Sequence, residues 1–249
     1  MGLSTDKILQ AAANMSEKLT GNRQPATAIQ HLDIGPGHGD LIELLRSKFN
    51  LDSSACDYTN TLMHLKDVRV DVVDLNVEKL PYADAKYDLV TCTEVLEHLE
   101  HYRETIREVH RVLKTDGAFV LTTPNIVNLK SRVRFMVIGF YNLFGPLHFN
   151  ESELHSAGGH INPIGLYFLI HSLVDAGFKD IEVTIDKRQG TSMFWMLFFF
   201  LPIKFFFLLV KRREIKRYQT IDRHNEKYVD MVNDLDILLG RTLVVGCRK

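Results

Sequence analysis

Residues 28–39 read AIQHLDIGPGHG, an apolar run that turns abruptly into three glycines spaced two apart. The first eight residues predict a buried parallel strand, GPGHG predicts a tight turn, and DLIELLRSKF at 40–49 predicts the helix that follows. Glycines suit such a turn because a ligand can approach more closely than a β-carbon would allow. The stretch therefore predicts a nucleotide-type cofactor site, whose acid and glycines are Asp33, Gly35, Gly37 and Gly39.

Strand-like and helix-like segments alternate from residue 28 to residue 125. This alternation predicts an α/β fold in which a mostly parallel sheet has helices on both faces. Beyond the first strand and helix, we expect strands at 53–58, 69–76, 87–95, 117–125, 179–187 and 241–249, and helices at 101–114 and 165–178.

The composition limits the class of protein. With 249 residues and 45% hydrophobic side chains, the chain is long enough for a single domain over 1–249, with a helical extension at 1–27 capped by Ser4 or Thr5. A net charge of −1 provides no basic field for nucleic acid. The three cysteines are far apart, and the N-terminus resembles no signal peptide. We therefore expect a cytoplasmic protein that does not bind nucleic acid.

Acidic residues follow several of the predicted strands, at the sheet edge where open α/β sheets bind ligands. Asp57 comes 18 residues after Gly39, where a carboxylate can accept both hydroxyls of a ribose. Asp74 can accept an adenine amino group, and the backbone N–H of Leu75 can meet a ring nitrogen. Glu94 follows the fourth strand. Any one of these acids is also explained as a solvated strand end, but their register with the glycine turn favours a site.

The combination of these motifs resembles the class I S-adenosylmethionine-dependent methyltransferases. The resemblance rests on the glycine pattern at 33–39, on Asp57, on the segment 72–117 with its EVLEHL and RVLKTDG motifs, and on TTPN at 122–125. It implies a Rossmann-like, seven-stranded sheet whose sixth and seventh strands form an antiparallel pair.

This resemblance also implies S-adenosylmethionine as the cofactor. The glycine turn would lie under its methionine part, and Asp33 would order that turn and the amino group. Thr93 and Glu94 would line the methionine side, while Asp57, Asp74 and Leu75 would hold the ribose and adenine. A nicotinamide dehydrogenase fits less well, because Asp40 stands where its fingerprint needs a third glycine.

Methyl transfer needs alignment of the reactants and, for a hydroxyl acceptor, a base. Histidine is the natural base near neutral pH. The resemblance puts His98 of EVLEHL close to the cofactor and His160 of GGHINP where substrate enters. Either residue is equally explained by a structural role. Nothing in the spacing of histidines and cysteines signals a metal.

Residues 126–164 form the expected substrate lid region. Lys130, Arg132 and Arg134 accompany a dense apolar face there, which suits a lid helix or a surface that touches lipid. TTPN followed by such a segment also resembles methyltransferases of bacterial polysaccharide and lipopolysaccharide assembly.

Residues 190–240 form a hydrophobic and basic insertion before the last strand. Its core, FWMLFFFLPIKFFFLLV at 194–210, contains Pro202 and Lys204 and precedes the basic run KRREIKR. If the flanking strands are neighbours, the insertion leaves and returns on one side of a membrane, which excludes a single crossing. We expect a segment that dips into one leaflet, broken at Pro202, with basic residues at the headgroups. The alternative is a helix buried against the body or in a homodimer interface.

Together these observations predict a methyltransferase attached peripherally to the inner face of a membrane, acting on an amphipathic acceptor such as a lipid-linked sugar or a lipid. One alternative is a methyltransferase for a soluble metabolite or a quinone-like lipid, with the insertion serving dimerisation. Another is a non-catalytic partner protein that binds the cofactor.

Overall fold

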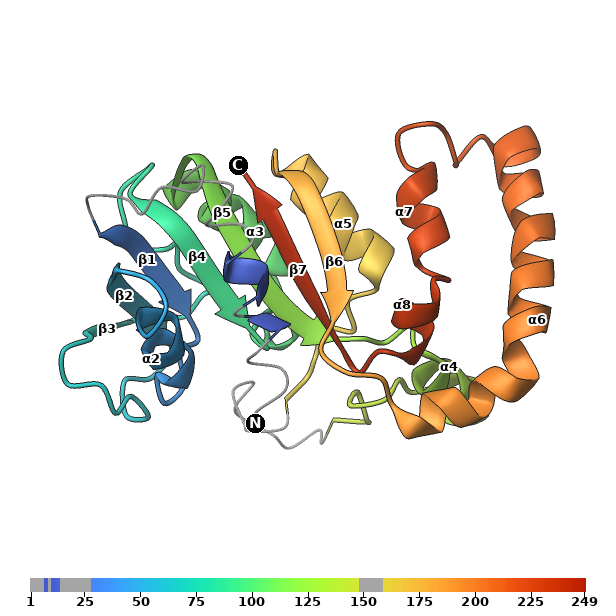
Figure 1. The fold of residues 1–249 in the computed structure, drawn as a ribbon, viewed down its shortest axis with the longest axis horizontal. Coiled ribbons are helices and arrows are strands. Elements are labelled where there is room, and N and C mark those ends of the chain that lie inside the picture. Colours follow the sequence, from blue (N-terminus) through green and yellow to red (C-terminus); the bar gives the residue numbers. More distant parts are fainter. Residues whose placement is uncertain (1–6, 9, 14–27, 148–158) are drawn as a thin grey trace.

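The computed structural model describes residues 7, 8, 10–13, 28–147 and 159–249, and a seven-stranded sheet forms its core (Figure 1). The strand order is β3-β2-β1-β4-β5-β7-β6. Strands β1 to β5 pair in parallel, and β7 pairs antiparallel with both β5 and β6. This confirms the predicted mostly parallel sheet with an antiparallel pair at its end. The strands are β1 Ile29–Ile34, β2 Leu51–Asp57, β3 Val70–Val72, β4 Tyr87–Thr93, β5 Leu113–Pro124, β6 Lys179–Ile185 and β7 Thr242–Arg248.

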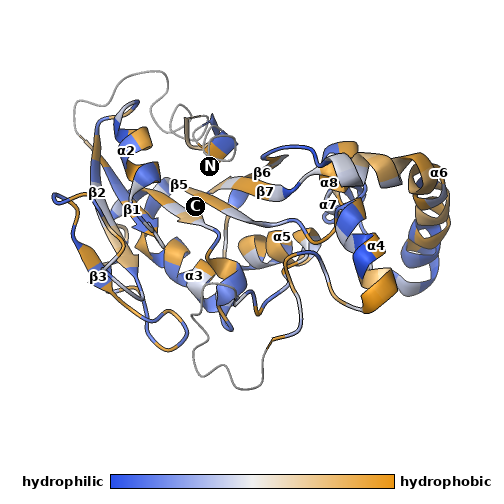
Figure 2. Ribbon diagram, turned by 90° about the horizontal axis from the view of Figure 1, so that it is seen from below, coloured by the Kyte–Doolittle hydropathy of each residue, from blue (hydrophilic) through white to orange (hydrophobic). Residues whose placement is uncertain are grey.

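Helices cover both faces of the sheet, as Figure 2 shows. Alternate residues of β5 illustrate why: Phe119 packs in a cluster with α3 and α5, whereas Val120 packs in another with α2 and the N-terminal Ile8. The predicted cap at Ser4 or Thr5 lies outside the described residues. The helices are α2 Asp40–Arg46, η1 Leu96–His98, α3 Tyr102–Val112, α4 Leu129–Ile138, α5 Leu166–Asp175, α6 Gly190–Arg213, η2 Glu214–Tyr218, α7 Glu226–Met231 and α8 Leu235–Leu239.

Several elements are shorter than their patterns predicted, and α3 and β3 show why. The helix expected at 101–114 ends at Val112, and β5 begins at the next residue. β3 covers only three residues of the expected 69–76, because the carbonyl of Asp74 accepts hydrogen bonds from the N–H groups of Val77 and Glu78 and turns the chain away. Asp74 therefore lies in a turn beyond β3 and does not end the strand.

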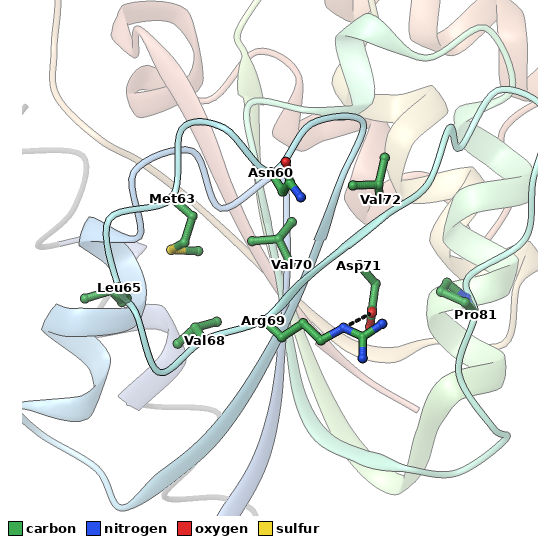
Figure 3. A pocket seen from close by; sticks show the side chains of 9 residues that line it. All are labelled: Asn60, Met63, Leu65, Val68, Arg69, Val70, Asp71, Val72 and Pro81. Carbon is green, nitrogen blue, oxygen red and sulfur yellow. Dashed lines mark ion pairs between the residues drawn. The ribbon is translucent and has the colours of Figure 1, made fainter.

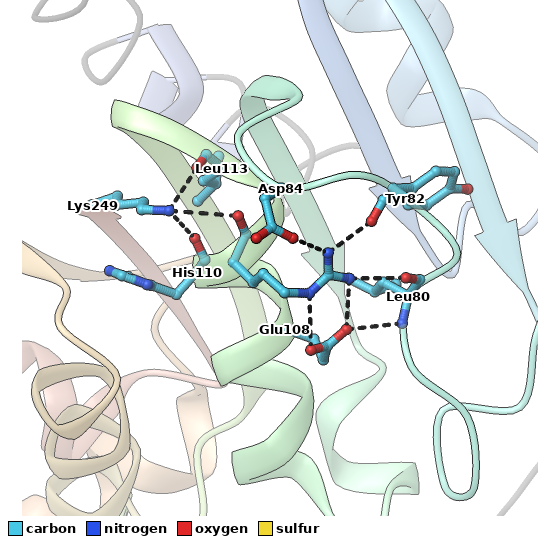
Figure 4. A network of polar contacts seen from close by, with 8 residues as sticks. Leu80, Tyr82, Asp84, Glu108, His110, Leu113 and Lys249 are labelled. Atoms are coloured by element: carbon cyan, nitrogen blue, oxygen red, sulfur yellow. Dashed lines mark hydrogen bonds and ion pairs between the residues drawn. The ribbon is translucent and has the colours of Figure 1, made fainter.

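A polar network fixes the C-terminal end of α3 against the sheet (Figure 4). The Arg111 guanidinium donates to the carboxylates of Glu108 and Asp84 and also to two backbone carbonyls in the segment before β4. The Lys249 ammonium donates to the carbonyl of His110 at 2.6 Å and to that of Leu113 at 2.8 Å. A cation at the C-terminal end of a helix satisfies carbonyls that have no helical partner. The network thereby joins the segment before β4, the helix and the chain's last residue.

The insertion enters and leaves the sheet at one point. Arg188 pairs with Gly240 in an isolated antiparallel bridge, and the Gln189 N–H donates to the carbonyl of Leu239 at 2.8 Å. The Asn125 side chain, from the TTPN motif, donates to the carbonyl of Gly240 as well. We call residues 188, 189, 239 and 240 the clamp. Its existence supports the premise that the insertion returns to the side from which it left.

One expectation about the insertion is wrong. Pro202 was expected to break the segment, but it lies inside α6, which continues to Arg213. Figure 1 shows α6 bent into two arms. A proline inside a helix removes one hydrogen bond and clashes with the preceding turn, so it bends a helix without necessarily ending it.

The two arms of α6 have different surroundings. Trp195, Phe199 and Phe200 of the first arm pack against buried leucines of α4 and α8. By length and composition, the helix from Gly190 to Tyr218 is apolar enough to cross a membrane. Many of its large apolar side chains are exposed: Met193, Phe194, Leu197, Phe198, Leu201, Phe205, Phe206, Leu208, Leu209 and Val210.

Candidate functional site

A pocket of about 260 Å³ lies at the carboxyl ends of β1, β2 and β4. Open α/β sheets bind ligands where the strand order reverses, and β1 has its successor β2 on one side and β4 on the other. Most of the residues that the sequence predicted for the site line this pocket. They are Gly35, Gly37, Asp57, Asp74, Leu75, Thr93, Glu94 and His98.

Glycine is needed at the three positions of the turn for different structural reasons. All have φ in the left-handed region, at 70° for Gly35, 52° for Gly37 and 94° for Gly39. A β-carbon on Gly35 would lie 2.3 Å from Val95, whereas one on Gly37 would meet nothing within 4 Å. Gly37 therefore leaves open space at the pocket. Gly39 does not line the pocket, because it is the residue from which α2 starts.

Asp33 lies beneath the glycine turn, fully buried, and not in the wall of the pocket. Its Oδ1 accepts a 2.6 Å hydrogen bond from the Thr91 hydroxyl, which also contacts His31 Nε2 at 2.8 Å. His31 Nδ1 lies 3.1 Å from the Ser53 hydroxyl. Burial lowers the pKa of His31 to about 3, so the ring is neutral, and Nε2 carries its proton because the Thr91 hydrogen is committed to Asp33. Burial raises the pKa of Asp33 to about 7.

The predicted adenosine-binding residues surround one part of the pocket. Asp57 ends β2 with a half-buried side chain. The Asp74 carboxylate accepts a hydrogen bond from the Asn76 N–H at 2.9 Å, which fixes its orientation. Among the described residues, no hydrogen bond engages the Leu75 N–H. This backbone group is thus available to a ligand beside Asp74.

Glu94, directly after β4, has an unusual backbone conformation. Its φ is 54°, in the left-handed region that non-glycine residues rarely adopt. Its N–H donates to the carbonyl of Thr122 at 3.1 Å, and the Thr122 hydroxyl donates to its carboxylate at 3.2 Å. Such strain is concentrated at functional sites. Burial of its surroundings raises the pKa of Glu94, although the side chain reaches solvent at the pocket.

Beside this pocket the structure brings together His98, His160 and Glu97. The two imidazoles are perpendicular, with ring centroids 4.7 Å apart. One possible ligand atom from each of the three residues lies within 4.8 Å of the others. Burial raises the pKa of Glu97 well above its usual value, and the charge of Glu94 adds to this effect. Burial and the neighbouring His98 lower the pKa of His160.

Sequence reasoning passed over Glu97, although EVLEHL contains it. Its side chain is 0% exposed, and one oxygen accepts from the Thr123 hydroxyl at 3.2 Å. The cluster of Glu97, His98 and His160 is recognised only in the folded protein, where the segment containing His160 lies against η1. In the sequence, residues 97 and 160 are far apart.

A larger hollow of about 850 Å³ lies at the outer edge of the sheet, around β3 (Figure 3). It contains none of the predicted site residues. Arg69 and Asp71 form a 3.1 Å ion pair at its surface. The glycine turn does not contribute to this hollow, so it is a poor candidate for the cofactor.

Comparisons with known proteins agree with this geometry. Residues 32–121 match the family model of the methyltransferase domain. A probable S-adenosylmethionine-dependent methyltransferase of Mycobacterium tuberculosis is 32% identical over 183 residues, which cover 67% of this chain and 58% of that protein. A ubiquinone biosynthesis O-methyltransferase of Rickettsia felis is 28% identical over 180 residues, 70% of this chain and 68% of that protein.

The fold is shared with solved structures. A SAM-dependent methyltransferase from Archaeoglobus fulgidus superposes with a TM-score of 0.57 at 16% identity, covering 98% of this chain and 94% of that one. A Haemonchus contortus phosphoethanolamine N-methyltransferase in complex with S-adenosyl-L-methionine has a TM-score of 0.52 at 15% identity, covering 96% and 52%. This chain spans 58% of the length of the mycobacterial relative.

The raised pKa of Asp33 predicts a characteristic pH dependence of stability. Between its ordinary pKa of 3.8 and about 7, the folded protein retains a proton that the unfolded chain has lost. The free energy of unfolding should therefore fall as pH rises through this window, by on the order of 4 kcal/mol, and level off above it. Asp33→Asn lacks this contribution, so its stability relative to wild type should increase from pH 4 to pH 7. Urea denaturation at several pH values measures the difference.

The exposed carboxylate of Asp52, on the neighbouring strand, provides a control in Asp52→Asn. Parallel stability curves for wild type and Asp33→Asn across this window would contradict the assignment of a buried, proton-retaining Asp33.

Proposed function

We propose that this protein, whose residues 32–121 match the methyltransferase domain, is an S-adenosylmethionine-dependent methyltransferase that transfers a methyl group to an amphipathic acceptor at a membrane surface. The observation that carries the catalytic part is the pocket itself. It combines the glycine turn after β1, Asp57 at the end of β2, Asp74 in the turn beyond β3, and the strained Glu94 after β4.

The residues present fit S-adenosylmethionine. Gly37 leaves room for close approach of the methionine part, and Thr93 and Glu94 lie at the end of β4 beside it. The Asp57 carboxyl group can accept hydrogen bonds from two ribose hydroxyls, and such charge-assisted bonds are the stronger ones. Leu75 offers a backbone donor to the adenine.

When bound, S-adenosylmethionine supplies an electrophilic methyl group on a sulfonium. The protein has to align the acceptor with that methyl group and to remove a proton when the acceptor is a hydroxyl. The new bond joins acceptor oxygen and carbon, the carbon–sulfur bond breaks, and its electron pair stays on sulfur. His98 lines the pocket and His160 packs against it, so these two remain the candidates for receiving the proton.

The insertion provides the argument for a membrane surface. The second arm of α6 exposes Phe205 and Phe206, and α4, which contacts α6, exposes Met136 and Val137 as well. A region that exposes so many large apolar side chains marks an interaction site. Since the clamp joins both ends of the insertion, a single crossing would separate strands that are paired in one sheet. We therefore infer that α6 lies along one leaflet, on the cytoplasmic side.

Basic residues at the end of α6 add electrostatic attraction to anionic lipids. They are Lys211, Arg212 and Arg213 in the last turn of α6, and Lys216 and Arg217 in η2 directly after it. Lys211 is already paired with Glu226 and Asp230 of α7 at 2.8 and 2.6 Å. The others are largely exposed and would face headgroups.

An enzyme attached in this way has access to acceptors that partition into the bilayer. A lipid-linked sugar or a lipid, as in bacterial polysaccharide assembly, is the first candidate class. A quinone-like lipid is the second, favoured by the similarity to a ubiquinone biosynthesis O-methyltransferase. Both classes join an apolar tail to a polar head that carries nucleophilic oxygens.

Replacement of Asp57 by alanine tests the cofactor site. Loss of the carboxylate should weaken S-adenosylmethionine binding by about 1 to 3 kcal/mol, because two hydroxyls lose a charged acceptor. Isothermal calorimetry measures the affinity. Asp71→Ala, on the adjacent strand β3 and facing the other hollow, is the matched control. Equal cofactor affinity in Asp57→Ala and wild type would remove Asp57 from the site.

Phe206→Asp tests the membrane surface. Phe206 is 62% exposed, so its replacement should leave the fold intact, while anionic vesicle binding should weaken about tenfold or more through loss of apolar burial and added charge. Phe168→Asp on α5 is the matched control, because Phe168 is 61% exposed outside the insertion. Co-sedimentation with vesicles measures binding. If wild type ignores vesicles and Phe206→Asp converts a dimer to a monomer, α6 is a dimer interface.

Transfer of labelled methyl groups from S-adenosylmethionine tests the acceptor class. Incubation with a bacterial lipid extract should move label into the organic phase, and removal of the extract should abolish that transfer. Chromatography of the product separates methylated sugar lipids from quinones. Label that appears only in water-soluble products would overturn the amphipathic acceptor.

A further inference from the structure

We propose that Glu97, His98 and His160 form a binding site for one divalent transition-metal ion beside the cofactor pocket. Two imidazoles and one carboxylate are a known ligand set for such ions, with further positions left for water or substrate. The three residues come from η1 and from the segment at 159–162. The binding of the ion is independent of the proposed function, and only its use in catalysis rests on that function.

Backbone hydrogen bonds hold the two segments together. The N–H groups of Ile161 and Asn162 both donate to the carbonyl of Glu97 at 3.0 Å. The Asn162 side chain donates to the carbonyl of Leu99 at 3.0 Å. The convergence of the three side chains therefore follows from the backbone and does not depend on their own rotamers alone.

Both histidines are oriented as metal ligands usually are, with one ring nitrogen bonded to the backbone and the other directed to the ion. His98 Nδ1 donates to the carbonyl of Gly159 at 2.9 Å, which makes Nε2 its metal-binding nitrogen. The His160 ring hydrogen-bonds to the backbone of Leu143. Among the described residues no partner lies at its buried Nδ1, so the Leu143 bond belongs to Nε2 and Nδ1 faces the cluster.

Glu97 supplies the independent observation that a cation belongs here. The side chain is wholly buried, one oxygen accepts from Thr123, and no N–H or O–H group among the described residues other than the Glu94 carboxyl group is near enough to donate to the other oxygen, Oε1. Two neighbouring carboxyl groups of which one is buried need a shared proton or a cation between them, and the two adjacent imidazoles favour the cation. A divalent cation would pair with this carboxylate and also attract the neighbouring Glu94.

The three ligand atoms would have to move only slightly closer together to bind an ion. They lie within 4.8 Å of one another, whereas ligand atoms about 2.1 Å from a zinc ion lie somewhat closer together. Both histidines are only partly buried, so their rings have room to move inward. Imidazole ligands favour zinc, iron(II), nickel or copper over magnesium, which prefers oxygen.

An ion at this position would change how a hydroxyl acceptor becomes a nucleophile. Because His98 lines the cofactor pocket, the cation would lie next to the reacting methyl group. A nearby divalent charge lowers the pKa of an oxygen that contacts it, so the hydroxyl proton can leave to water. The oxygen then forms the bond to the methyl carbon as the carbon–sulfur bond breaks. With the ion bound, His98 and His160 would be ligands, and water would take the proton in place of the histidine base considered above.

Direct metal titration tests the site. The full chain is treated with a chelator, dialysed, and titrated with Zn²⁺ by calorimetry and with Co²⁺ by visible absorption, without S-adenosylmethionine or acceptor. We expect one ion per chain. His160→Ala and Glu97→Gln should each weaken binding by more than about tenfold, since even residues that only support a ligand have effects of that size. Thermal unfolding of each variant without metal verifies that it is folded.

His64→Ala is the matched control. His38 and His64 form another neighbouring pair, with ring centroids also 4.7 Å apart, but stacked and without a buried carboxylate. Metal binding should be unchanged in this variant. The proposal is overturned if wild type binds no ion stoichiometrically, if His160→Ala binds as tightly as wild type, or if His64→Ala loses the site. None of these outcomes bears on cofactor affinity, so failure of the metal site is distinguishable from failure of the proposed methyltransferase.

Discussion

A buried chain of hydrogen bonds across three central strands fixes the arrangement on which the pocket depends. Ser53 of β2, His31 of β1 and Thr91 of β4 lead to Asp33, which lies beneath the glycine turn. Buried polar groups are costly unless paired, so a shift in register between these strands would leave several of them unsatisfied. This series of hydrogen bonds therefore aligns the carboxyl ends of β2, β1 and β4, where the predicted ligand-binding residues are.

The sheet and most of the pocket were predictable because their signals are local. The apolar run before Gly35 and the strand-ending position of Asp57 are visible in the sequence without any knowledge of tertiary contacts. Features that depend on long-range packing were not visible. The strained φ of Glu94 follows from its bonds to Thr122, and the role of Glu97 depends on a segment more than sixty residues away.

The bend of α6 shows a different limit of sequence reasoning. Pro202 signals an interruption, but whether a helix ends or bends depends on what packs around it. Here Trp195, Phe199 and Phe200 are held by α4 and α8 before the proline, and Lys211 is paired with α7 after it. With both arms fixed by tertiary contacts, the helix is maintained through the bend.

The clamp has a consequence for how such a protein is assembled from parts. Since Gln189 and Leu239 are hydrogen-bonded, the sheet is closed at that point whatever the length of chain between them. Insertions are tolerated best where their two ends already meet. The part of the insertion that could be exchanged most freely is α6 itself, because Tyr228, Met231 and Ile237 further along pack into the main core and would have to be kept.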